Sequence, residues 1–105
     1  MMIDALKKLF GAGPTLDLGD KIKDGAIIID IRSKGEIESG HLKSSKNIPL
    51  HQLPSHLLRL DKNKAIITCC ASGMRSGSAK SLLLSNGFED VHNGGSWNSI
   101  KNYGA

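Results

Sequence analysis

Cys70 and Arg75 flank a short glycine-containing stretch, with four residues between them. An apolar run typical of a buried strand, residues 65–69, precedes the stretch, and a helical pattern, residues 78–85, follows it. The cysteine therefore ends a strand, and the arginine stands where a helix begins. The first amides of a helix lack intrahelical partners, and the helix dipole is positive there, so this position favours a thiolate. We predict that Cys70 has a lowered pKa and acts as a nucleophile at neutral pH.

The residues between and after this pair predict a ring of backbone donors around an anion. Gly73 allows backbone angles that are closed to other residues, so the loop amides can point inward. The Arg75 guanidinium has two possible orientations, inward to an anionic substrate or outward to a carboxylate that braces the loop. Its positive charge favours the thiolate in both. The candidate substrate-binding residues are Ala71, Ser72, Gly73, Met74, Arg75 and Ser76.

Asp30 and Arg32 stand at the end of a second apolar run, residues 26–31. We consider them supporting residues, with two interpretations. In the first, Asp30 accepts hydrogen bonds from the catalytic loop and braces it. In the second, the two side chains form a purely structural ion pair. Both interpretations predict that mutation of either residue is damaging.

Strand-like and helical patterns alternate along the chain, which predicts an α/β domain with a mainly parallel sheet and helices on both faces. The expected strands are residues 15–18, 26–31, 47–48, 65–69 and 89–92. The expected helices are residues 18–22, 32–39, one that begins near Pro54, 78–85, and a turn or helix from 94–97. In such sheets, ligands bind beyond the carboxyl ends of the strands, where Asp30 and Cys70 both lie.

The length of 105 residues suits one domain. We expect residues 1–14 to form an amphipathic helix and linker, with Ile3, Leu6, Leu9 and Phe10 at helical spacing, and residues 15–105 to form the domain.

Composition and charge argue against several classes of partner. The net charge is +4, but the lysines are scattered and do not alternate with aromatic residues, so we expect no nucleic-acid partner. No apolar run is long enough to span a membrane, so we expect no membrane partner. The only cysteines, Cys69 and Cys70, are adjacent and form no disulfide framework. A free reactive thiol fits the cytoplasm, and the histidines have no metal-ligand spacing with the cysteines, so no metal or cofactor is expected.

Six segments, in order, resemble the single-domain rhodanese (thiosulfate sulfurtransferase) family, and in particular its short phage-shock-type members. They are IIDIR (28–32), EIESGHL (36–42), NIP (47–49), CASGMRS (70–76), GFEDV (87–91) and GGSW (94–97). The resemblance implies a five-stranded sheet and Cys70 as the carrier of a persulfide. It also implies transfer of a sulfane sulfur from thiosulfate or a persulfide to cyanide or a thiol. Three departures are Lys43-Ser44-Ser45 in a turn usually made of proline, glycine and alanine, Cys69 at a commonly aromatic position, and a short tail after Trp97.

The remaining chemically capable residues are expected to be structural. Cys69 alternates with Cys70 along its strand and therefore faces the opposite side, as buried packing, with a resolving thiol as the alternative. In the family pattern His41 belongs to a structural turn, and a persulfide mechanism needs no strong base. Trp97 is expected to anchor the core.

Three functions compete. The first is a sulfurtransferase that uses small-molecule donors and acceptors. The second is a sulfur-relay or binding module with a protein partner. The third is a cysteine phosphatase or arsenate reductase, whose loops hold one residue more between cysteine and arginine. The four-residue spacing favours the first over the third.

Overall fold

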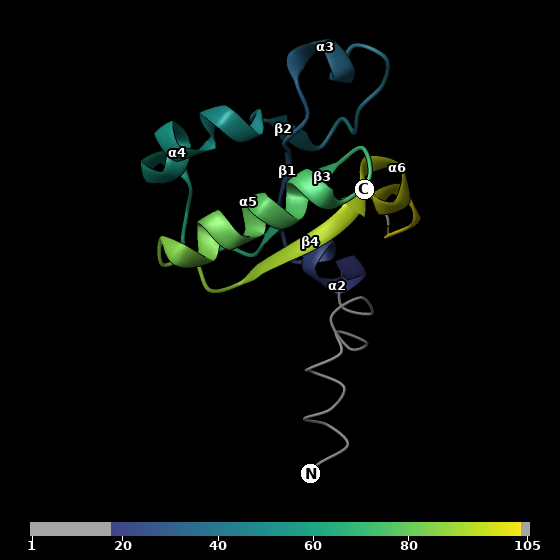
Figure 1. The fold of residues 1–105 in the computed structure, drawn as a ribbon. Helices are drawn as coiled ribbons and strands as arrows, with labels where there is room; N and C mark the ends of the chain where they lie inside the picture. The colour runs from purple at the N-terminus through teal and green to yellow at the C-terminus, as the bar shows by residue number, and fades with distance from the viewer. Residues whose placement is uncertain (1–17, 104–105) are drawn as a thin grey trace.

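A computed structural model describes residues 18–103 and contains one parallel sheet (Figure 1). In these residues the sheet has four strands in the order β2-β1-β3-β4. The strands are β1 (Ile27–Asp30), β2 (Ser45–Asn47), β3 (Ile66–Cys70) and β4 (Val91–Ser96). Every neighbouring pair is parallel, as the alternation of elements predicted.

The prediction of five strands is wrong for the described part of the chain, where the sheet has four. Residues 15–17 of the expected edge strand lie outside the described residues, as does the helix expected within residues 1–14. Leu18 begins a helix, α2 (Leu18–Lys23). Leu18 and Ile22, one helical turn apart, both pack into the core, and this spacing favours a helix over a strand.

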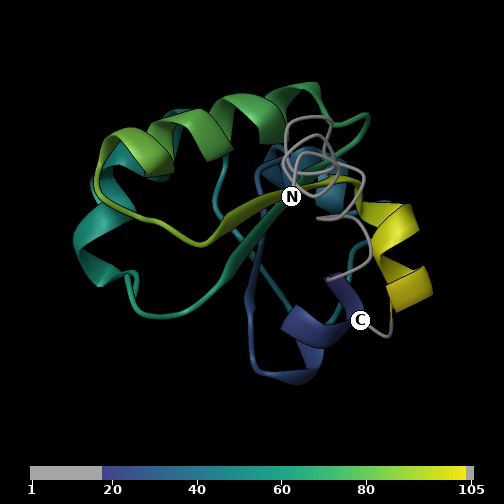
Figure 2. The same ribbon diagram turned by 90° about the horizontal axis from the view of Figure 1, so that it is seen from below.

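Helices cover both faces of the sheet, as predicted (Figure 2). On one face lie α5 (Met74–Ser85) and α4 (Leu53–His56), the latter between the 3-10 turns η2 (Leu50–Gln52) and η3 (Leu57–Arg59). On the other face lie α2 and α6 (Trp97–Ile100), followed by η4 (Lys101–Tyr103), while α3 (Lys34–Ile37) follows β1. None of the helices within residues 18–103 has the length and apolar character needed to cross a bilayer.

Side chains that alternate along the central strands build two cores. All five residues of β3 are buried, and so are the last three of β1. Ile29, Leu53 and Leu83 share one core with Cys70. Ile28 and Ile100 share the other with Cys69. The two cysteines therefore face opposite sides of the sheet, as the alternation predicted.

The pairing of β3 with β4 contains a bulge next to the Cys70 loop. Thr68 pairs with Asn93, and Cys70 pairs with Ser96, so β4 advances by one residue more than β3. A Cβ atom at Gly94 would lie 2.7 Å from Ile100 Cδ1 and 2.8 Å from Ile67 Cγ2. The bulge thus requires glycine, since any side chain there would collide with the core.

The helix after the cysteine begins four residues before the predicted Ser78. Its N-cap is Gly73, with a φ of 99° that other residues rarely adopt, and its first residue is Met74. Arg75 therefore lies in the first turn of α5. The loop between strand and helix is correspondingly short, and it draws the first turn of the helix toward Cys70.

Candidate active site

Cys70 is the last residue of β3 and has no exposed surface. The Gly73 amide donates a hydrogen bond to its Sγ atom over 2.8 Å. The Ser76 hydroxyl lies 3.5 Å from the same sulfur and is itself fully buried. The sulfur is thus held inside the loop by donors from the following helix turn.

These donors lower the pKa of Cys70. Burial raises the pKa, but hydrogen bonds from the Ser76 hydroxyl and from the amides of Ser76, Gly73 and Ser72 outweigh it. The net pKa lies below the usual value of 9.0, the direction predicted from the strand–helix junction. Hydrogen bonds are the cause, and a thiolate at this position is a stronger nucleophile at neutral pH.

The Arg75 side chain points outward, the second of its two predicted orientations. Its Nη1 and Nη2 atoms bind Glu36 Oε1 and Oε2 over 2.6 and 2.8 Å. This bidentate hydrogen bonding is the main reason that the pKa of Glu36 falls to about 2. Arg75 therefore ties the start of α5 to α3, and its charge is compensated by the carboxylate.

Glu36 was not identified as a site residue from the sequence, although a local signal for it exists. Ser33 and Glu36 form a capping box, in which Ser33 Oγ accepts from the Glu36 amide and Glu36 Oε1 accepts from the Ser33 amide. The spacing of serine and glutamate predicts that box. The long-range partner, 39 residues away, follows only from the fold.

Asp30 and Arg32 form a buried ion pair, which is the second of the two interpretations. Arg32 Nη2 and Nε lie 2.7 and 3.0 Å from the Asp30 carboxylate, and both residues are almost fully buried. Within residues 18–103, that carboxylate accepts hydrogen bonds only from Arg32. The prediction that Asp30 accepts hydrogen bonds from the catalytic loop is therefore wrong, because Arg32 occupies its oxygens.

Arg32 also links β1 to the far side of the sheet. Its Nη2 donates to the Gly40 carbonyl over 2.8 Å, and its guanidinium lies 4.6 Å from the centre of the Trp97 ring. Trp97 packs against the second core, which agrees with its expected anchoring role. His41 is exposed, with Nδ1 3.2 Å from the Ile37 carbonyl, and lies in the connection between α3 and β2.

Asn93 holds the loop from β4 and was not identified from the sequence. Its Nδ2 donates to the Gly73 carbonyl over 3.0 Å, and its Oδ1 accepts from Ser76 Oγ over 2.6 Å. Thr68 Oγ1 donates to the Ser76 carbonyl over 2.9 Å. No local pattern marks Asn93, because its place beside the loop depends on the register of β3 with β4.

The remaining candidate residues lie in the same loop and first helical turn. Ala71, Ser72 and Met74 are exposed, with Met74 82% accessible, whereas Ser76 is buried. The six candidate substrate-binding residues thus follow Cys70 directly in this loop and helical turn, and the amides of Ser72, Gly73 and Ser76 donate to its sulfur. Asp30 and Arg32 stand apart from them as a structural pair.

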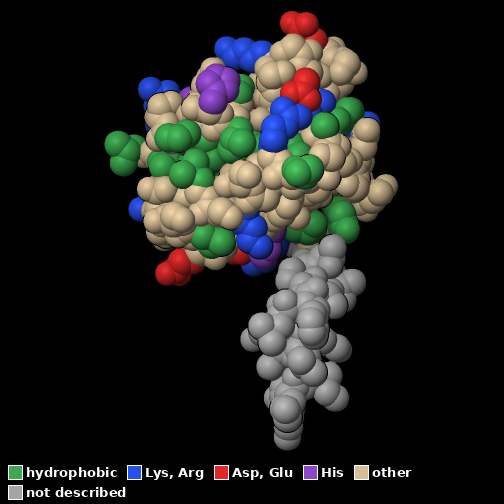
Figure 3. Space-filling view, in the orientation of Figure 1, with side chains coloured by type: hydrophobic (Ala, Val, Ile, Leu, Met, Phe, Trp, Pro, Cys, Tyr) green, Lys and Arg blue, Asp and Glu red, His purple; other side chains and the backbone are tan. Residues whose placement is uncertain are grey.

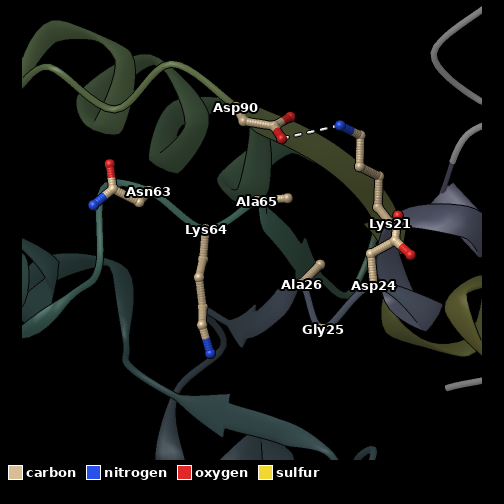
Figure 4. A pocket seen from close by; sticks show the side chains of 8 residues that line it. All are labelled: Lys21, Asp24, Gly25, Ala26, Asn63, Lys64, Ala65 and Asp90. Carbon is tan, nitrogen blue, oxygen red and sulfur yellow. Dashed lines mark hydrogen bonds and ion pairs between the residues drawn. The ribbon is translucent and has the colours of Figure 1, made fainter.

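Two of the cavities lie at opposite ends of the strands, one at their carboxyl ends and one at their amino ends. A groove of about 330 Å³ shares Arg75 with the loop, and its other lining residues are Ile31, Ser33, Pro49, Leu50 and His51. A second cavity, about 230 Å³, is lined by the residues that immediately precede β1, β3 and β4, namely Ala26, Ala65 and Asp90 (Figure 4). The Lys21–Asp90 ion pair, 2.9 Å long, lies beside it. Of these two cavities, only the first is lined by one of the candidate substrate-binding residues, Arg75.

Cys69 is as buried as Cys70 but has a different environment. It is fully buried in the opposite core. Burial, followed by the charge of the adjacent Asp30, raises the pKa of Cys69 to about 12. This protonated thiol fits the packing role expected from the sequence.

The model of the rhodanese-like domain family matches residues 15–102. The chain belongs to the rhodanese family. Among curated rhodaneses it is similar to the thiosulfate sulfurtransferase GlpE of Stutzerimonas stutzeri, with 34% identity over 68 residues, 65% of this chain and 62% of the relative. The match spans 54 to 66% of the length of this relative and of two further curated relatives.

Solved structures show the same rhodanese fold. A rhodanese-like domain protein from Staphylococcus aureus is 28% identical, with a TM-score of 0.69 over 82% of this chain and 86% of that one. A rhodanese with anions from E. coli is also 28% identical, with a TM-score of 0.67 over 71% of this chain and 91% of that one.

Proposed function

We propose that this rhodanese is a sulfurtransferase that carries a sulfane sulfur as a persulfide on Cys70. The observation that carries the proposal is the ring of donors around a buried cysteine of lowered pKa. Membership of the family and the similarity to a thiosulfate sulfurtransferase support it. The same donors that stabilise a thiolate stabilise the terminal anion of a persulfide.

In the first half-reaction the Cys70 thiolate attacks the outer sulfur of thiosulfate. A new bond forms between Sγ and that sulfur, the sulfur–sulfur bond of thiosulfate breaks, and sulfite leaves with the bonding electron pair. The two reactants carry three negative charges in all. One remains on the persulfide anion and two leave with sulfite. The amides of Ser72, Gly73 and Ser76 are placed to hold the persulfide anion.

In the second half-reaction cyanide or a thiolate attacks the outer sulfur of the persulfide. The bond between Sγ and the outer sulfur breaks, the Cys70 thiolate is restored, and thiocyanate or a new persulfide leaves. Neither half-reaction needs a metal or a redox cofactor, because the sulfur changes partners through electron pairs alone.

The orientation of Arg75 argues against a phosphatase or arsenate reductase. A cradle for a tetrahedral oxyanion needs free donors that point inward, whereas the Arg75 guanidinium is bound to both oxygens of Glu36. The four-residue spacing between Cys70 and Arg75 also leaves a smaller ring than those enzymes have.

Exposed apolar side chains favour a second candidate, in which the donor or acceptor is a protein. Figure 3 shows hydrophobic side chains on the surface over α4 and α5. Leu58 in η3 and Met74 and Leu84 in α5 are large apolar residues with exposures of 102%, 82% and 44%. Met74 directly follows the Cys70 loop as the first residue of α5, so a partner that contacts it also reaches the loop.

Two free cysteines suit a reducing compartment, and we propose that the protein is cytoplasmic.

Intact mass spectrometry after incubation with thiosulfate tests the proposal. We expect one added sulfur atom on the wild-type chain and on Cys69→Ser, released by cyanide as thiocyanate. Cys70→Ser should take up none, because a hydroxyl forms no persulfide. Sulfur uptake by Cys70→Ser, or its loss in Cys69→Ser alone, would overturn the choice of nucleophile.

A comparison of donors separates the two candidates. Turnover with thiosulfate and cyanide is expected of the small-molecule enzyme. Loading by a cysteine desulfurase that carries a persulfide, with little turnover of thiosulfate, is expected of the relay. Met74→Ser should weaken only the protein-dependent reaction.

A further inference from the structure

Asn93, a surface residue of β4, makes three short hydrogen bonds at the Cys70 loop. Its Nδ2 donates to the Gly73 carbonyl over 3.0 Å. Its Oδ1 accepts from Ser76 Oγ over 2.6 Å and from the Gly95 amide over 2.9 Å. We infer that Asn93 is a positioning residue that sets the ionisation of Cys70 by holding Gly73 and Ser76. The inference rests on the proposed function for one point only, namely that the Cys70 thiolate is used to carry sulfur.

Gly73 is held at both of its backbone groups. Its amide donates to Cys70 Sγ over 2.8 Å, and its carbonyl accepts from Asn93. Glycine has many accessible backbone conformations, so the amide points at the sulfur only while other contacts hold the residue. The carboxamide of Asn93 supplies such a contact from a neighbouring strand, which does not move with the loop.

Ser76 is the second group that Asn93 controls. Its hydroxyl lies between Cys70 Sγ, at 3.5 Å, and Asn93 Oδ1, at 2.6 Å, and also reaches the Gly73 carbonyl. When Cys70 is a thiol, its S–H donates to Ser76 Oγ, and the hydroxyl proton is donated to Asn93. When Cys70 ionises, the hydroxyl proton turns toward the sulfur and leaves Asn93 Oδ1, which keeps the Gly95 amide as a partner. The contribution of Asn93 to the thiolate therefore comes through Gly73, whose amide it directs at the sulfur.

The fold brings Asn93 close to the loop through small residues and the β4 bulge. Asn93 pairs with Thr68 immediately before the bulge. A Cβ atom at Gly77 would lie 3.3 Å from Asn93 Nδ2, and one at Gly73 would lie 3.3 Å from Gly95 Cα. Larger residues at these positions would push β4 away from the loop, and the carboxamide would lose its partners.

The rate of alkylation by iodoacetamide as a function of pH tests the inference in Asn93→Ala. The midpoint of thiol ionisation should rise by about half to one pH unit, the effect of losing about one hydrogen bond. The rate below the midpoint should fall about threefold to tenfold. Asn98→Ala is the matched control, since Asn98 is also exposed, lies in α6 and makes no side-chain hydrogen bond within residues 18–103. It should keep the wild-type midpoint.

Two outcomes overturn the inference: an unchanged midpoint in Asn93→Ala, or an equal shift in Asn98→Ala. Thermal unfolding of each variant establishes that the fold is intact. If Asn93→Ala does not fold, Asn93→Ser is used, with Asn98→Ser as the control. Asn93→Ser removes the carboxamide donor to Gly73 without adding a charge beside Cys70, so its midpoint should rise more than that of its control, and an equal midpoint would overturn the inference. Failure of sulfur uptake by the wild-type chain would overturn the proposed function, but it would leave this comparison of midpoints decisive.

Discussion

At the scale of single residues, the two adjacent cysteines have pKa values that are shifted in opposite directions. Cys70 ends β3 within reach of hydrogen-bond donors, and its pKa is lowered. Cys69 lies on the other face of the same strand, and its pKa is raised to about 12. The pleat of a strand, which turns successive side chains to opposite faces, thus places one thiol where its pKa is lowered and its neighbour where its pKa is raised.

Alkylation of the wild-type chain should therefore titrate as one thiol with a midpoint below 9.0. Cys70→Ser should abolish the fast reaction, and Cys69→Ser should leave it unchanged, as followed by mass spectrometry across a pH series. A midpoint at or above the usual value would show that burial outweighs the loop donors.

At the scale of elements, one ion pair joins α3 to the first turn of α5. Arg75 and Glu36 are bound through two hydrogen bonds of 2.6 and 2.8 Å. Because the Arg75 guanidinium is bound to Glu36, we propose that Arg75 supports sulfur transfer by holding the loop in shape. A displacement of about 1 Å at a catalytic group is enough to lower a rate about a hundredfold.

We expect Arg75→Ala and Glu36→Gln to lower sulfur transfer by about tenfold to a hundredfold, and by similar factors for thiosulfate and for an uncharged persulfide donor. Steady-state rates with both donors provide the measurement. A loss confined to thiosulfate in Arg75→Ala would mean that the guanidinium binds the dianion directly.

The Arg75–Glu36 ion pair makes the stability of the fold depend on pH, with lower stability at acid pH. The pKa of Glu36 in the fold is about 2, below its ordinary value of 4.5. Its stabilising contribution is therefore complete above about pH 4.5 and is lost as the pH falls toward 2. The difference in melting temperature between wild type and Glu36→Gln should shrink over this range, and a difference that persisted at pH 2 would contradict the assignment.

The bulge in β4 leads to a further prediction at this scale. Gly94→Ala should destabilise the protein by about 1–3 kcal/mol, because its methyl group would overlap Ile67 and Ile100. Gly35→Ala is the control, since nothing lies within 4 Å of a Cβ atom there. Chemical denaturation of the two variants measures the difference, and equal stability would show that the bulge yields at little cost.

The elements that can be predicted from the sequence are those whose residues show a local period or cap. The parallel sheet follows from alternating apolar runs, and Cys70 at the end of β3 follows from residues 65–69. The start of α5 does not, because Gly73 takes an N-cap conformation that places the helix earlier than its apolar pattern indicates. Glu36 and Asn93 are also missed as site residues, since their roles depend on pairings 39 and 20 residues along the chain.

At the scale of the whole molecule, Arg32 connects three regions. It pairs with Asp30 in β1, donates to the carbonyl of Gly40, and lies over the ring of Trp97 in α6. The pair is almost completely buried, so removal of one partner leaves an uncompensated charge. This buried pair contributes to the stability of the fold as a whole and lies outside the Cys70 loop.

We expect Arg32→Ala to destabilise the protein by about 3–5 kcal/mol and to change the fluorescence of Trp97, the only tryptophan. Urea denaturation followed by that fluorescence measures both effects. The exposed Arg59 provides the control, and Arg59→Ala should cost no more than about 0.5 kcal/mol. A similar small loss in Arg32→Ala would show that the buried pair contributes little.

The carboxylate of Glu36 contacts both α3 and the first turn of α5. We expect this shared carboxylate to couple the local unfolding of these two helical segments. Its Oε1 atom caps α3 through Ser33 and also accepts from Arg75. A four-residue helix has little stability of its own, so the capping contacts and the ion pair form and break together. The amides of α3 and of the first turn of α5 should therefore exchange their hydrogens as one cooperative unit. An anionic donor that drew Arg75 inward would break its ion pair with Glu36 and so release α3 as well. The loading of sulfur would then change the conformation of α3 at the protein surface.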